Sequence, residues 1–407
     1  MSTAGGKSCR GAGRRGPGRT SWWIAWRQSR TTPAGRFILI ASAPAWSPQV
    51  FINNWYAACI AHELVQTPLR VRILDCDLVL FRDRAGTAHC LSDACCHRGA
   101  SLAAGQCRDD RLICPQHGWE YDGSGRCVRV PAGIKDPAAP PRKARVPAYP
   151  VEERYGLVFV FLGDQDEAAR PALRNILPEY DDPDGWHVGI LSRQKDIHYV
   201  RMAENYNDPC HVHYVHEFGK WLPKGVTIET IELADTYVKA FHAAWDAKGQ
   251  TSRDRGLMME FDVIGMVSRN TNNQPGYPET VVVATVTPID DANTQIFMLL
   301  LQPKQGVSAA DHQGLLTMTR DQVMNEDYAV LKTARPRQAA SPAEELLVET
   351  DVTVAQVRKM TRDYAARHGE IDASALAALR DTHIRVLPCP GHRTDPGQWV
   401  HKTVPLR

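Results

Sequence analysis

Two cysteines and two histidines near residue 100 are spaced as an iron–sulfur cluster needs them. The segment Cys95–His97 reads C-C-H and, sixteen residues later, Cys114–His117 reads C-P-Q-H. Each segment supplies one thiolate and one imidazole, and Gly99 and Gly118 stand where a backbone must pass close to a cluster. In a Rieske [2Fe–2S] centre, two cysteines bind one iron and two histidines bind the other. The sequence therefore predicts four cluster ligands: Cys95, His97, Cys114 and His117.

Structural zinc is the main alternative, because zinc also binds two cysteines and two histidines. Zinc sites usually pair like with like, as C-x₂₋₄-C and H-x₃₋₅-H. A C-x-H pair opposite a C-x-x-H pair is uncommon among them. If the two cysteine–histidine pairs occurred in a loop by chance, nothing would explain the glycine that follows each pair. We therefore favour the iron–sulfur cluster over both alternatives.

A second group of candidate ligands lies about a hundred residues further along the chain. The stretch 204–216 holds Asp208 and three histidines, among which His213 competes with His211 and His216 for the role of ligand. A non-haem Fe(II) oxygenase binds its metal through two histidines and one carboxylate on one face, which leaves positions open for O₂ and substrate. The stretch therefore predicts a mononuclear iron site. The simpler interpretation is a polar helix end whose histidines are all hydrogen-bonded.

We expect the chain over residues 196–216 to be helical. Asn205, Asp208 and His211 are then three residues apart and share one side of the helix. His211 and His216 are five residues apart, which is off the ideal face. The expectation therefore includes a distortion between them, such as a π-type turn.

The elements around the two sites differ, and this divides the chain into two domains. Residues 50–164 show short apolar runs cut by turn residues, which predicts a small all-β domain. Residues 165–407 add helical patterns, which predicts an antiparallel sheet packed by helices and an α+β class for the whole. The expected strands are 71–74, 78–81, 157–162, 237–245, 257–267, 280–287 and 294–302, and the expected later helices are 313–331 and 344–368.

The composition is that of an ordinary soluble protein. Of 407 residues, 23% are charged, and the formal net charge of +2 gives no reason to expect nucleic acid or a membrane as a partner. No apolar run approaches the roughly 20 residues of a membrane span. The cysteines number eleven, which is odd, and five of them lie from Cys90 to Cys114. This favours a metal site in the reducing cytoplasm over disulfide bonds.

The N-terminal segment differs from the rest of the chain. The first fifty residues hold eight Lys or Arg and no Asp or Glu. We expect residues 1–49 to form a basic, disordered arm outside both domains.

Both candidate sites occur in the order and spacing of one protein family. The matching motifs are D-x-C-x-H-R-G at 93–99, C-P-x-H-G-W-x-Y-D-x-x-G at 114–125 and N-x-x-D-x-x-H-x-x-x-x-H at 205–216. From about Asn53 onward the chain resembles the oxygenase (α) components of Rieske non-haem iron oxygenases. It is most similar to the group of dicamba and vanillate O-demethylases and saxitoxin-type hydroxylases. The resemblance implies a Rieske domain followed by a helix-grip-like catalytic domain.

The resemblance also implies the ligands of the mononuclear iron. It assigns His211 and His216 as iron ligands and does not assign His213. It further implies a distant carboxylate, for which Asp327 is the best match, 111 residues after His216. The rival carboxylates are Asp321 and Glu326.

A further implication of the resemblance concerns how the two centres are connected. In the family, the counterpart of Asp208 bridges an iron-ligand histidine, here His211, and a cluster histidine of the neighbouring chain, here His117. The arrangement implies a homotrimer, with Asn205 as a supporting residue beside the iron. A carboxylate that accepts a hydrogen bond from a metal-bound imidazole also fixes the orientation of the ring.

The implied activity is the O₂-dependent hydroxylation or oxidative demethylation of a small organic molecule, with an aromatic or polycyclic substrate expected. The electrons would come from a separate ferredoxin or reductase, because the sequence has no credible flavin or nicotinamide site. Ring cis-dihydroxylation is the alternative activity. A Rieske electron-transfer protein without catalytic iron is the alternative from another functional class. Cys96 and Gln116 depart from the residues common in the family, but neither is a predicted ligand.

Overall fold

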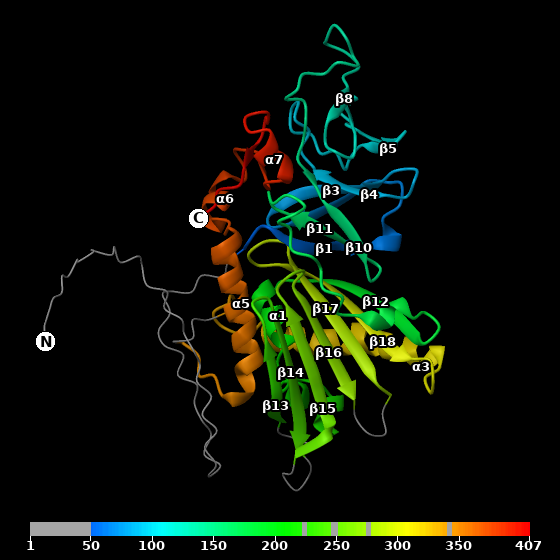
Figure 1. The fold of residues 1–407 in the computed structure, drawn as a ribbon, viewed down its shortest axis with the longest axis vertical. Helices are drawn as coiled ribbons and strands as arrows, with labels where there is room; N and C mark the ends of the chain where they lie inside the picture. The colour runs from blue at the N-terminus through cyan, green and yellow to red at the C-terminus, as the bar shows by residue number, and fades with distance from the viewer. Residues whose placement is uncertain (1–49, 222–225, 246–250, 274–277, 340–343) are drawn as a thin grey trace, which may run out of the picture. The chain divides into compact units, whose positions relative to one another are not determined.

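The computed structural model describes residues 50–221, 226–245, 251–273, 278–339 and 344–407. Figure 1 shows their arrangement. The predicted arm of residues 1–49 lies outside the described residues. In the described part of the chain, no helix combines the length and the apolar character that crossing a bilayer would require.

The N-terminal part is built from three small antiparallel sheets, as the short apolar runs predict. The strand orders are β1-β11-β10, β2-β3-β4-β9 and β5-β6-β7-β8. The bounds are β1 Asn54–Ile60, β2 Leu69–Ile73, β3 Cys76–Arg82, β4 Ala88–Ser92, β5 Gln106–Arg108, β6 Arg111–Ile113, β7 Glu120–Tyr121, β8 Cys127–Arg129, β9 Ala148–Tyr149, β10 Val151–Arg154 and β11 Leu157–Leu162.

The second part is dominated by one seven-stranded antiparallel sheet of order β12-β18-β17-β16-β15-β14-β13. This confirms the predicted α+β class. The bounds are β12 Trp186–Lys195, β13 Val226–Leu233, β14 Tyr237–Trp245, β15 Thr251–Asp262, β16 Val267–Asn273, β17 Thr280–Pro288 and β18 Thr294–Pro303.

Two details of the predicted sheet were wrong. The run 257–267 is not one strand, because β15 ends at Asp262 and a turn with positive φ at Gly265 and Met266 leads into β16. β12 and β13 also escaped prediction. Their burial patterns alternate poorly, so no period of two marks them in the sequence.

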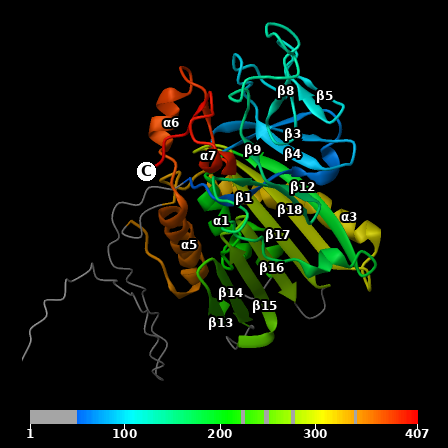
Figure 2. The ribbon, with the colours of Figure 1, turned by 45° about the horizontal axis from the view of Figure 1, so that its top comes forward.

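Helices flank this sheet, and Figure 2 shows α3 near the edge formed by β12 and β18, and α5 near the opposite edge, by β13 and β14. The predicted helix 313–331 is a continuous run of α3, η4 and α4, in which η4 is a π-helical turn. The bounds are α1 Tyr199–Asn205, α2 Val212–Val215, α3 Ala309–Met318, η4 Thr319–Val323, α4 Met324–Leu331, α5 Val352–His368, α6 Ala373–Leu379 and α7 Pro390–Thr394. The short 3-10 turns and remaining strands are η1 Ala61–Glu63, η2 Pro178–Asp181, η3 Phe218–Trp221, η5 Glu349–Asp351, β19 Arg385–Val386 and β20 Lys402–Thr403.

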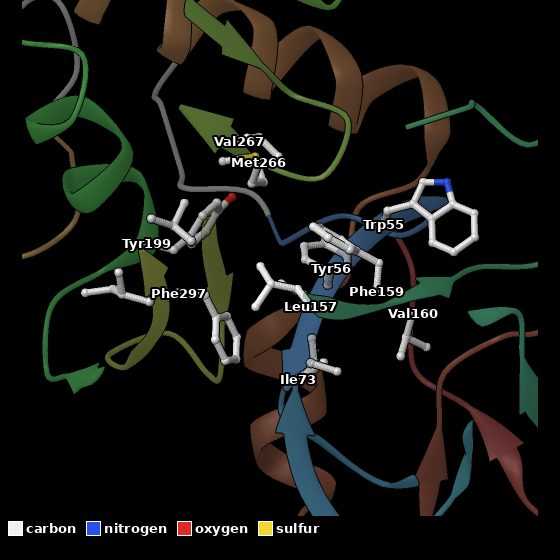
Figure 3. Close-up of a cluster of buried hydrophobic side chains, with 14 of the residues drawn as sticks. Trp55, Tyr56, Ile73, Leu157, Phe159, Val160, Tyr199, Met266, Val267 and Phe297 are labelled. Carbon is white, nitrogen blue, oxygen red and sulfur yellow. The ribbon is translucent and has the colours of Figure 1, made fainter. Parts of the chain in front are cut away.

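The hydrophobic core is continuous between the first sheet and the seven-stranded sheet. Figure 3 shows Trp55 and Phe159 in the same cluster as Phe297 and Tyr199. These four side chains are at most 4% exposed. Aromatic burial on this scale is a large contribution to stability. The core therefore holds β1 and β11 against the elements that lead to the second site.

The C-terminal segment returns to the N-terminal part of the chain. The Tyr149 hydroxyl donates to the Leu387 carbonyl at 3.0 Å, and Arg145 forms a 2.8 Å ion pair with Asp395. The guanidinium of Arg145 also lies 4.2 Å from the ring centroid of Trp399. Residues late in the predicted second domain therefore pack on the first. The predicted boundaries of residues 50–164 and 165–407 stay a prediction.

A buried ion-pair network joins α1 to α5. Arg358 of α5 contacts Glu204 of α1 through its Nε, and its Nη1 lies 2.6 Å from Glu345. Arg201 reaches the same two carboxylates at 3.3 Å and 3.1 Å. Burial raises the pKa of Glu204, so its charge depends on these guanidinium partners. The network fixes the helix from which the second site continues.

Replacing Arg358 with Met should leave the buried Glu204 carboxylate poorly compensated. We expect the free energy of unfolding to fall by about 3–5 kcal/mol, as measured by denaturant unfolding. The matched control is Lys359→Met, whose exposed pair with Asp363 at 2.7 Å should contribute less than about 1 kcal/mol. Equal losses in the two variants would contradict the assigned role of the network.

Candidate metal centres

The two predicted cluster segments fold into the same turn. In each, the amide of the cysteine donates to the carbonyl five residues later, from Cys95 to Ala100 at 2.9 Å and from Cys114 to Trp119 at 2.8 Å. The glycine at the fourth position after each cysteine donates back to that cysteine's carbonyl. Gly99 and Gly118 both have positive φ, at 77° and 68°, where a side chain would strain the backbone. The glycines noted in the sequence thus define the shape of both loops.

The four predicted cluster ligands are brought together by these loops. The thiols of Cys95 and Cys114 are neighbours, and their interaction raises the pKa of Cys95 and lowers that of Cys114 to about 6. The rings of His97 and His117 lie 4.6 Å apart between centroids. A pair of thiols beside a pair of imidazoles is the donor set that a Rieske cluster requires. The residues present therefore fit this group.

The thiolate side of this site is buried, whereas the imidazole side is open. The Tyr121 hydroxyl lies 3.0 Å from the Cys95 sulfur and 3.3 Å from the Cys96 sulfur. His97 and His117 are exposed, and His97 stacks on Trp119 with centroids 4.6 Å apart. Electrons can therefore approach or leave through the histidine edge. Cys96, the unusual residue of the first loop, is packed against Tyr121.

The predicted helix over 196–216 was wrong, because the chain breaks between α1 and α2. Asp208 lies in the break, while His211 and His216 flank α2 as its N-cap and C-cap residues. The buried side chain of Asn207 holds the break. Its Nδ2 donates to the Ala203 carbonyl and, at 2.8 Å, to the Ser268 hydroxyl on the sheet. This anchor was missed by sequence reasoning, although an asparagine next to a helix end is a usual signal for one.

Two histidines five residues apart meet one carboxylate here because α2 is a single turn that follows His211 and ends at His216, where the backbone is extended. The Nε2 atoms of His211 and His216 lie 3.5 Å and 3.3 Å from the same oxygen, Oδ1 of Asp327. Asp327 comes from the first turn of α4, directly after the π-helical turn η4. The ligand atoms of these three residues all lie within 4.8 Å of one another. Two imidazoles and one carboxylate are the donor set of a facial Fe(II) site.

The other ring nitrogens of the two histidines are occupied. Nδ1 of His211 lies 2.8 Å from the Asp208 backbone carbonyl, and Nδ1 of His216 lies 3.0 Å from Glu326. A carbonyl oxygen only accepts, so the Nδ1 of His211 carries the proton and its Nε2 lone pair faces Asp327. Burial also lowers the pKa of His211, which favours the neutral form that a metal ligand needs.

A buried acceptor without a partner indicates that this site is built for a cation. Oδ1 of Asp327 is buried and has no hydrogen-bond donor in the described part of the chain. Buried polar atoms are nearly always paired, so such an oxygen facing two imidazole lone pairs is costly unless a cation lies between them. A ferrous ion therefore fits the residues present.

The rival ligands occupy other positions. Asp321 is exposed and paired with Arg320 at 2.6 Å. Glu326 contacts His216 at Nδ1, and so it orients the ring through the nitrogen that does not face Asp327. His213 is buried but does not belong to the group of three converging residues.

Asp208 and Asn205 lie beside this group. The Asp208 carboxylate accepts from the Cys210 amide at 2.7 Å, and its Oδ2 lies 3.7 Å from Nδ1 of His211. Its side chain is 29% exposed. Within the described residues, no hydrogen bond or ion pair joins it to the cluster loops of the same chain. Asn205 is buried at the end of α1, and its Nδ2 lacks an acceptor there.

Two domain families match the chain in the order of the two sites. Residues 54–150 match the Rieske [2Fe-2S] domain, and residues 196–367 match the vanillate O-demethylase oxygenase C-terminal domain. The first range contains both cysteine–histidine loops. The second contains the three converging residues. Domains of these two kinds bind a [2Fe–2S] cluster and mononuclear iron, respectively.

Among curated relatives, methylxanthine N1-demethylase of Pseudomonas putida is 27% identical over 352 residues, which covers 80% of this chain and 93% of that protein. Phenoxybenzoate dioxygenase subunit alpha of Ectopseudomonas oleovorans is 35% identical, but the match covers 40% of this chain and 42% of that one. Dicamba O-demethylase of Stenotrophomonas maltophilia is 37% identical over 40% of this chain and 47% of its own. The matched regions of the last two relatives thus span less than half of their length.

The fold is also that of solved structures. The crystal structure of dicamba monooxygenase bound to dicamba superposes with a TM-score of 0.65 at 25% identity, covering 78% of this chain and all of that one. The fold, the two domain matches and the two sets of converging side chains agree with one another. The chain belongs to the Rieske non-haem iron oxygenases, as an oxygenase component with a Rieske domain followed by a vanillate O-demethylase-type C-terminal domain.

Proposed function

We propose that this protein uses O₂ and electrons from a separate reductase to hydroxylate or oxidatively demethylate a small organic molecule. The observation that carries the proposal is the convergence of the two histidine Nε2 atoms on one oxygen of Asp327. An electron-transfer protein would have no use for this second site. Two of the three relatives named above are demethylases and one is a dioxygenase subunit, which supports demethylation of an aromatic or heterocyclic substrate over ring dihydroxylation.

The proposed ligands follow the two donor sets. Cys95, Cys114, His97 and His117 would hold the cluster, and His211, His216 and Asp327 would hold the mononuclear iron. When bound, the cluster supplies one-electron transfer, and the ferrous ion supplies a site at which O₂ is activated.

The protein residues around the iron orient the ligands. The Asp208 carbonyl and the Glu326 carboxylate keep both ligand rings in the tautomer that presents Nε2. Held by these three residues, a ferrous ion would keep coordination positions for O₂ and substrate.

We further propose that Asp208 connects the iron site to the cluster of a neighbouring chain in a homotrimer. Two observations support this. His97 and His117 are exposed in the single chain, and the Asp208 side chain is partly exposed beside His211. A carboxylate between two metal-bound imidazoles would hold both rings in line for electron transfer.

A cytoplasmic location completes the proposal. The cysteines within the described ranges are free thiols, which suits a reducing compartment.

Replacing Asp327 with Ala should remove the mononuclear iron and spare the cluster. Iron content measured on the anaerobically loaded protein should fall from about three to about two per chain, while the visible absorption of the Rieske centre persists. Asp321→Ala, on the same helical run, is the matched control and should keep all the iron. Full iron retention in Asp327→Ala would rule out this carboxylate as a ligand.

Replacing Asp208 with Asn should keep both metal centres and slow the passage of electrons between them. We expect turnover with a surrogate reductase to fall by about 10–100-fold, because the neutral amide orients a ligand imidazole less well. Single-turnover kinetics of cluster oxidation would report the step directly. Asp235→Asn, at a position 89% exposed, is the control. Wild-type rates in Asp208→Asn would remove the bridge.

A further inference from the structure

One buried histidine outside the metal ligands has no hydrogen-bond partner. His242 of β14 is fully buried, and neither of its ring nitrogens has a partner in the described part of the chain. Burial lowers its pKa to about 4, so the imidazole is neutral near pH 7, with one donor and one acceptor. Buried polar groups are nearly always paired, so these two nitrogens require an explanation.

The face of the sheet that carries His242 is the face toward the segment between α1 and α2, which precedes the predicted iron ligand His211. On β16 the side chains of Ser268 and Asn270 contact Asn207 and the Tyr206 carbonyl, both at 2.8 Å. Asn270 is in register with Met259 of β15, and Met259 with Ala240 of β14. Partners in register share a face, and so do residues two apart in a strand. His242 therefore faces the same side as Asn270, one row further along.

The chain that leaves the iron site re-enters the sheet beside this histidine. Ile228 of β13 is in register with His242 and lies twelve residues after His216. On the same face, Oδ1 of Asn270 and Oδ1 of Asn272 also lack partners among the described residues. The unpaired groups thus gather on the inner face of the sheet, next to the segment that carries an iron ligand.

The three central rows of this inner face carry no charged residue among the described residues. Three rows of inward positions cross the sheet through Ser268, Asn270 and Asn272 of β16. Among the described residues of β12 and β14 to β18 in these rows, none is Lys, Arg, Asp or Glu. A carboxylate bound against this surface would therefore lack a counter-ion from it, and an unpaired buried charge is costly.

We propose that His242 hydrogen-bonds a neutral polar group of the substrate, and that the substrate is an uncharged aryl ether, amide or heterocycle rather than a carboxylic acid. The inference rests on the proposed function and names the substrate class of the same site. Weakly polar substrates suit a face on which apolar side chains alternate with a few amides and the imidazoles of His187 and His242.

The first test asks whether His242 serves binding or stability. His242→Leu removes two unpaired buried nitrogens, so the thermal midpoint of the iron-loaded protein should rise by a few degrees. The matched control is His198→Leu. His198 is equally buried, but its Nδ1 accepts from the Val200 amide at the start of α1, so its loss should lower the midpoint. A lower midpoint in His242→Leu would overturn the proposal, because the side chain would then be structural.

The second test compares two probes of the same shape, 4-methoxybenzamide and 4-methoxybenzoate. Calorimetry on the anaerobic, iron-loaded protein should give about tenfold tighter binding of the amide, and His242→Leu should lose about tenfold of that affinity. Equal or tighter binding of the benzoate, binding of neither probe, or wild-type amide affinity in the variant would each overturn the inference. Iron content and visible absorption of the same samples report separately on the proposed function.

Discussion

Two residues five apart cannot reach one metal ion from a regular α-helix. At 3.6 residues per turn they point about 140° away from each other. The chain meets this constraint by limiting α2 to the single turn Val212–Val215 and leaving the helical conformation at His216, so that the two histidines lie on either side of one turn. Asn207 fixes the break to the sheet and to α1. The convergence of the two histidines on Asp327 depends on the short α2 that lies between them.

The same constraint explains why so many polar groups are buried around the site. Asp327 follows a π-helical turn, which shifts the face that the rest of α4 presents. Its Oδ1 and both histidine Nε2 atoms face one another with no proton donor between them. Such a cluster costs free energy in the empty protein, and a cation at its centre compensates that cost. Metal binding and the local fold are therefore coupled.

Sequence reasoning predicted residues that converge in the structure, but it predicted the elements that carry them less well. The loops that begin at Cys95 and Cys114 each hold a cysteine and a histidine close together in sequence, and a glycine fixes each turn. Both loops could therefore be predicted from spacing alone. Asp327 needed the family resemblance, because no local pattern links it to residues 111 positions earlier. The break at Asn207 and the inward position of His242 depend on tertiary hydrogen bonds and strand register. No periodicity in the sequence encodes either of them.

We conclude that one chain holds two separate iron centres, a [2Fe–2S] cluster and a mononuclear iron. Anomalous diffraction at the iron edge, on crystals of the anaerobically loaded protein, tests it most directly. We predict one iron pair between the Cys95 and Cys114 loops, and a single iron within bonding distance of His211, His216 and Asp327. A map with the pair alone, or with the single iron bound elsewhere, would contradict the account.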